Sequence, residues 1–74
     1  MNKEKRKKLG KAFDLVAEAE QIINDVMEEE QDGYDNLPDS FRDGDRGQQM
    51  QDAIEMMDEV VGYLQDAESV IEQI

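Results

Sequence analysis

The sequence predicts an all-α fold: an antiparallel two-helix hairpin with helices at about residues 3–30 and 46–73 and a long loop over residues 31–45. Two observations carry this prediction. Apolar residues in each half recur at alternating spacings of three and four, which places them on one side of a helix. The only proline, Pro38, lies between the two halves together with two of the five glycines. The 74 residues suffice for one small domain, residues 1–74.

The first predicted helix has an uninterrupted apolar stripe. Alanine, glutamate and lysine, which favour helix, fill much of the remaining sequence, and no proline interrupts it. Residues 1–8 are basic, and cations at a helix N-terminus oppose the macrodipole, which favours fraying there. The stripe comprises Leu9, Ala12, Val16, Ala19, Ile23 and Val26, widened by Phe13, Leu15, Ile22 and Met27.

The second predicted helix repeats the pattern. Asp45 followed by Gln48 has the spacing of a capping-box variant, which predicts a helix start near Arg46. Gly62 falls on the outer side, where it weakens the helix without opening the core. The stripe comprises Met50, Ala53, Met57, Val60, Leu64, Ala67, Ile71 and Ile74, widened by Ile54, Met56, Val61, Tyr63 and Val70.

Both stripes are wider than one neighbouring helix can cover. The chain has no cysteine for a disulfide and no histidine, the commonest metal ligand, so self-association is the remaining way to stabilise so small a core. We therefore expect a homodimer in which two hairpins form a two-fold symmetric four-helix bundle. The residues expected to mediate it are Val16, Ile23, Met57 and Leu64. The alternative is a monomer whose loop folds back over one end.

The connecting segment contains more than a turn requires. Asn36–Pro38 predicts a bend, because the residue before proline avoids helical geometry. Ser40–Asp43 predicts one helical turn with Ser40 as its cap. Leu37 and Phe41 then close the end of the bundle where the stripes run out. In the alternative, Phe41 is exposed and anchors a partner, as aromatic hot spots do.

Two arginines, Arg42 and Arg46, are the only cations after residue 11. Each is expected to bridge to carboxylates at the helix ends, such as Glu29 or Glu30.

The acidic loop does not predict a calcium site. An EF-hand that begins at Asp39 would have Phe41 at its third position and Met50 at its twelfth, which are not oxygen ligands. A di-iron bundle needs Glu-x-x-His motifs, and the chain has no histidine. The acids line a convex, wet surface and the serines lack a positioned base. No enzyme activity, cofactor or metal is expected.

The charge is strongly segregated. Residues 1–11 carry a net charge of +5 and residues 12–74 one of −17, giving −12 overall. Such a field repels nucleic acid and attracts basic partners, so no direct nucleic-acid binding is expected. The basic start could bind nucleic acid or an anionic membrane, but the hairpin places it beside Glu68 and Glu72, which favours internal neutralisation. No membrane-spanning stretch or secretory signal is present, which predicts a cytoplasmic protein.

The carboxylates on the outer helix faces are the main candidate site. Simple solubility explains a charged exterior, yet opposite charges are usually interspersed there. Rows of carboxylates on rigid helices can instead imitate a nucleic-acid backbone and block a protein partner with a basic groove. The residues expected to form this surface are Glu18, Asp25, Glu28, Glu29, Asp52, Glu55, Asp58 and Glu59. The alternative is an assembly or adaptor module that acts through its apolar stripe and loop.

The residues Asn36-Leu37-Pro38, Ser40, Arg46-Gly47, Met50 and Ala53-Ile54 form the pattern NLP-x-S-x5-RG-x2-M-x2-AI. This pattern resembles that of small acidic helical proteins of bacteria and their phages, over roughly Asp35 to Ile74. The group has no assigned activity, so the resemblance implies no site residue. It implies a phage or mobile element as the source and a bacterial host. Small acidic phage proteins often resemble inhibitors of host defence nucleases, including anti-CRISPR proteins, which supports the nucleic-acid-mimic interpretation.

Overall fold

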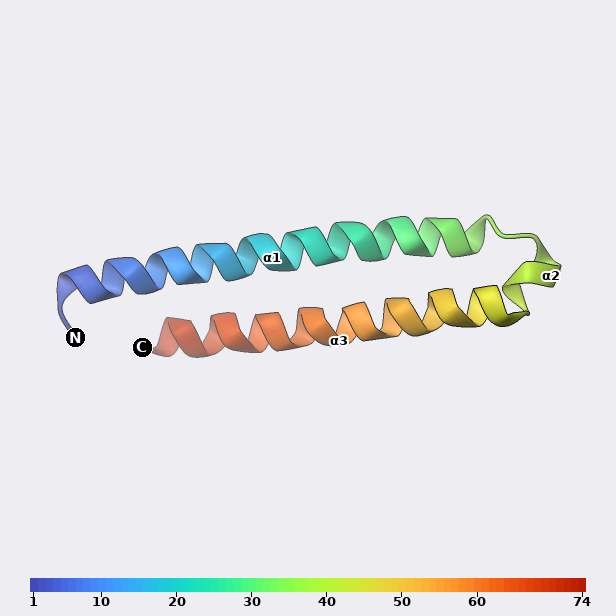
Figure 1. The fold of residues 1–74 in the computed structure, drawn as a ribbon. Helices are drawn as coiled ribbons and strands as arrows, with labels where there is room; N and C mark the ends of the chain where they lie inside the picture. Colours follow the sequence, from blue (N-terminus) through green and yellow to red (C-terminus); the bar gives the residue numbers. More distant parts are fainter.

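The computed structural model describes residues 1–74 as three helices and no strand: α1 (Lys3–Asp35), α2 (Asp39–Arg42) and α3 (Asp45–Gln73). α1 and α3 lie side by side and antiparallel, α2 turns the chain at one end, and both termini lie at the other end (Figure 1). The molecule measures 59 × 15 × 11 Å, and its radius of gyration is 17.1 Å, against about 11 Å for a compact domain of this length. The predicted all-α hairpin is confirmed, as a thin rod.

α1 is longer than predicted. It begins at Lys3, where the backbone N–H of Lys5 donates to the Asn2 side chain at 2.8 Å. It continues past residue 30 to Asp35, because no proline intervenes before Pro38 and the Gln31 side chain donates to the Asp35 carboxylate one turn on. Asn36 is its C-cap. The connection therefore covers residues 36–44 rather than 31–45.

The predicted short helical turn is present as α2, but the predicted caps are wrong. Pro38, not Ser40, occupies the N-cap position of α2. Its ring has no polar atom, so it makes no side-chain cap hydrogen bond. Gly44 is the N-cap of α3, also without a side-chain bond, and Asp45 lies inside the first turn. A carboxylate there still interacts favourably with the positive end of the helix dipole.

Arg42 ties the connection to the end of α1. Its Nη2 donates to the backbone carbonyls of Asp35 at 3.0 Å and Leu37 at 3.2 Å. Its guanidinium lies 5.8 Å from the Tyr34 ring centroid and pairs with Asp39 at 3.6 Å. The predicted bridge to Glu29 or Glu30 is not made, because the unpaired carbonyls at the C-terminus of α1 compete for the same cation.

The contact between α1 and α3, called the seam here, is mostly half-buried. Val61, 7 % exposed, is the only buried apolar side chain. The predicted stripes are wrong at Val26 and Val60, which are exposed, while Met27 and Val61 face the opposing helix. Val16, Ile23, Met57 and Leu64 of the predicted stripes stay in the seam. Each helix is therefore rotated by only about half a residue, roughly 50°, from the predicted orientation, which the wide apolar arcs permit.

The two loop residues predicted to close the end of the bundle behave differently. Leu37 is half-buried, in keeping with a structural role, whereas the Phe41 side chain is 55 % exposed. Phe41 therefore does not close the end of the hairpin.

Gly47, the other buried residue, lies where the backbones of α2 and α3 approach each other closely. A Cβ at this position would overlap the carbonyl group of Arg42. Only glycine lets the first turn of α3 lie directly against the end of α2, since any side chain would push the two apart. This contact holds the start of α3 directly against the end of α2.

We predict that Gly47→Ala lowers the free energy of unfolding by about 1–3 kcal/mol, because the added methyl group forces backbone displacement. Urea denaturation followed by circular dichroism measures this change. Gly62→Ala is the matched control in the same helix, since nothing lies within 4 Å of its added Cβ. It should stabilise α3 by up to about 1 kcal/mol through helix propensity. Equal effects of the two substitutions would contradict the role given to Gly47.

Candidate interaction surfaces

Large apolar side chains remain exposed along both long helices. Met56 and Tyr63 are 65 % and 64 % exposed, respectively, although both lie within the helical part of the chain. The set, called the apolar face here, comprises Leu15, Ile22 and Val26 of α1 with Met56, Val60, Tyr63, Val70 and Ile74 of α3.

These residues lie on one side of the hairpin. On α1, Ile22 and Val26 each precede a seam residue by one position, and on α3 Met56 and Val60 do the same. One position is a rotation of about 100° about the helix axis. Because α1 and α3 run in opposite directions, the same rotation away from the seam brings both stripes to the same side of the molecule.

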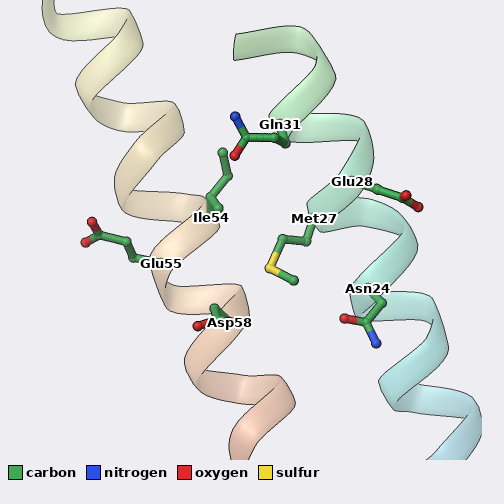
Figure 2. A pocket seen from close by; sticks show the side chains of 7 residues that line it. All are labelled: Asn24, Met27, Glu28, Gln31, Ile54, Glu55 and Asp58. Carbon is green, nitrogen blue, oxygen red and sulfur yellow. The ribbon is translucent and has the colours of Figure 1, made fainter. Parts of the chain in front are cut away.

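Residues that follow a seam position by one lie on the opposite side and form a shallow groove. Met27 extends into the space between the helices, and the Ile54 side chain points toward Gln31 (Figure 2). Glu28 and Glu55 point away from one another at its two edges (Figure 2). This acidic groove is lined by Asn24, Met27, Glu28, Gln31, Ile54, Glu55 and Asp58.

The structure brings only three of the eight predicted acidic residues together. Glu28, Glu55 and Asp58 line the groove. The others are exposed but line no part of it: Glu18, Asp25, Glu29, Asp52 and Glu59. Sequence spacing places such residues on the outside of each helix, but it does not show which of them meet across the seam.

The four residues predicted to mediate self-association lie on the inner side of both long helices. Val16, Ile23, Met57 and Leu64 are half-buried in the seam of one hairpin. Most residues of the apolar face are ones that the sequence pattern places at the margins of the predicted stripes. Their exposure depends on how each helix is rotated, which periodicity alone does not reveal.

Most charged side chains have no partner of opposite sign. The Arg42–Asp39 pair is the only ion pair in the molecule. Arg46 is exposed and unpaired, so its predicted bridge is absent. The six cations of residues 3–11 are also exposed and unpaired, so the expected pairing with Glu68 and Glu72 is not made. The N-terminal end projects past the end of α3 (Figure 1).

Two carboxyl groups meet within the seam. Gln65 donates to the Glu20 carboxylate at 3.3 Å, and one Glu68 oxygen is buried without a donor. The pKa of Glu68 is raised by a hydrogen bond with Glu20, by partial desolvation and by the negative charges of Glu20 and Glu72. When Glu68 is protonated, a proton between the two carboxyl groups can satisfy the otherwise unpaired oxygen.

On the apolar face, the Tyr63 hydroxyl donates to Glu59 at 2.7 Å. This bond raises the pKa of Tyr63, with smaller contributions from partial desolvation and from Asp66. The polar tip of this exposed ring is therefore satisfied while its apolar body faces outward.

No family model matches the chain, and no curated protein or solved structure shows significant similarity to it. Its acidic side chains do not gather in any group of three or more with the geometry to hold a metal ion. None of its helices combines the length and hydrophobicity needed to cross a bilayer. The apolar face and the acidic groove are therefore the features from which a function can be inferred.

We predict that the melting temperature rises as the pH falls from 7.5 to 5. The pKa of Glu68 is higher in the folded chain than its ordinary value of 4.5. The folded state therefore binds the proton more tightly, and lowering the pH through the folded-state pKa favours folding. Reduced repulsion in a chain of net charge −12 acts in the same direction.

Glu68→Gln should raise the melting temperature at pH 7.5 and flatten this pH dependence. Glu18→Gln is the control, since it removes the same charge from an exposed site outside the seam. If the two variants had identical pH profiles, the Glu20–Glu68 contact would not be the cause.

Proposed function

We propose that the protein is a non-enzymatic helical binding protein that self-associates through its apolar face, two hairpins forming a four-helix bundle. The exposure of eight large apolar side chains on one side of a two-helix rod carries this proposal. Contiguous apolar patches on soluble proteins mark interaction sites. A second hairpin would cover both stripes at once, which a single added helix would not.

The lack of an internal core supports the same proposal. One apolar side chain is buried in a chain of 74 residues. Helices in proteins draw most of their stability from the packing of an apolar face. Folding and association are then coupled, so the melting temperature increases with protein concentration.

We predict that the double substitution Ile22→Gln/Val70→Gln weakens dimerisation by at least about 100-fold, because each dimer loses four buried apolar side chains. Sedimentation equilibrium measures the dissociation constant. Phe41→Gln is the matched control, since Phe41 is as exposed as Ile22 but lies in α2, away from the apolar face. A control variant that dissociates equally would show that the apolar face is not the interface.

A second candidate function is inhibition of a basic partner by the acidic side. The specific observation that favours it is that Glu28, Glu55 and Asp58 line one groove that no cation lines. A partner whose groove binds nucleic-acid phosphates would be occupied competitively. The resemblance to small acidic phage proteins suggests defence nucleases, including CRISPR nucleases, as the class to test first. The exposed Phe41 would be an additional anchor.

We predict that a partner captured from a bacterial lysate is released steeply as salt increases, because the binding is electrostatic. The triple variant Glu28→Lys/Glu55→Lys/Asp58→Lys should fail to capture it. The triple variant Asp14→Lys/Asp66→Lys/Glu72→Lys, with the same change of net charge outside the groove, should retain it. Capture that is equal for both variants, or insensitive to salt, would exclude the acidic groove as the binding site.

A further inference from the structure

The apolar face has an internal symmetry. On each helix we count the spacing between consecutive residues of the face, including the half-buried alanines between the exposed residues. The series of spacings reads the same from either end of the stripe. They run 4-3-4 on α1 and 4-3-4-3-4 on α3. The two stripes are Leu15, Ala19, Ile22 and Val26 on α1, and Met56, Val60, Tyr63, Ala67, Val70 and Ile74 on α3.

The two stripes share one centre along the rod. The hydrogen bonds Gln65–Glu20 and Gln51–Tyr34 show which residues of α1 and α3 lie at the same level. The α1 stripe is centred between Ala19 and Ile22, and the α3 stripe is centred at Gln65. These centres coincide at the level of the Gln65–Glu20 bond. A single two-fold axis through this level, perpendicular to the helices, maps both stripes onto themselves.

We infer that a second copy of the chain docks on the apolar face in this orientation, with the two loops at opposite ends of the bundle. This inference rests on the proposed self-association and specifies its geometry. In this arrangement α1 lies on α1 and α3 on α3. Leu15 of one copy meets Val26 of the other, and Met56 meets Ile74. The longer α3 stripe is covered by an equally long one.

The other two-fold arrangement has its axis along the rod and both loops at one end. It places α1 of one copy on α3 of the other, so that the short stripe faces the long one. Met56 would then lie at the level of Glu29 of the second copy. One apolar side chain per copy would meet a charged one, which costs stability relative to the apolar match.

The distribution of charge selects the same orientation. Residues 1–11 carry +5 with no ion pair, and residues 28–46 at the loop end carry eight acids and two arginines. Opposite loop ends bring each basic end beside the acidic end of the other copy. Lys8, which continues the α1 stripe, then lies within one turn of Glu29 and Glu30 of the second copy. The other arrangement stacks the two acidic loop ends on each other, which opposes association.

The double variant Lys5→Glu/Lys8→Glu tests the contact between the basic end of one copy and the acidic end of the other. Both residues continue the α1 stripe toward the N-terminus, so the dimer should weaken about 10-fold at low salt, and much less at high salt. Lys3→Glu/Lys7→Glu makes the same charge change on the other side of α1 and should have an effect of less than about 2-fold. Equal weakening by both variants would overturn the proposed contact between the two ends.

Electron paramagnetic resonance distances decide the orientation directly. The chain has no cysteine, so Ser40→Cys places one spin label at the exposed loop end of each copy. We expect a loop-to-loop distance of about 50 Å, from a rise of 1.5 Å per residue, against less than about 25 Å if both loops lie at one end. In a mixture with Gly10→Cys, labels on different copies should come within about 25 Å of each other.

Sedimentation of the same labelled samples separates the outcomes. A dimer with long loop-to-loop distances supports the orientation. A dimer with short ones overturns the orientation and leaves the proposed self-association standing. A monomer at all concentrations overturns both.

Discussion

The structure depends on one constraint: each long helix has only one neighbour. α1 and α3 bury side chains against each other along a single line, and α2 covers only the turn at one end. A helix with an apolar stripe wider than one contact must leave part of that stripe in water. Val61 alone becomes buried, while eight large apolar residues stay exposed on one side. The need for a further surface follows from this geometry, whichever partner supplies it.

For the same reason, the contacts in the turn contribute more to defining the fold than they would in a protein with a well-packed core. A seam that is only half-buried, and that contains Glu20, Glu30 and Glu68, does little to fix the register of two antiparallel helices. The fixed points lie at the loop end. Arg42 binds the carbonyl groups at the end of α1, and Gly47 lets α3 start directly against Arg42. Together, these contacts connect the end of α1 to the start of α3 through Arg42.

Sequence reasoning reached the helical hairpin, the short helical turn and the excess width of the apolar stripes, because all three follow from local periodicity. It missed the choice between Val60 and Val61 and between Val26 and Met27. Both members of each pair are apolar, so periodicity fits either rotation. It also missed the partners of Arg42, since backbone carbonyls leave no trace in the sequence. The acidic groove was missed for a related reason: Glu28 and Asp58 become neighbours only when the rotation is known.

The two proposed activities use opposite sides of the rod and are therefore compatible. Exposed apolar residues precede the seam positions by one residue, and groove residues follow them by one, so a rotation of about 200° separates the two sets. A dimer closed over its apolar face would leave one acidic groove on each outer surface, related by the two-fold axis. A partner with two basic sites would then bind more tightly than either groove alone allows. Self-association would in that case raise the affinity of the acidic surface without adding any contact to it.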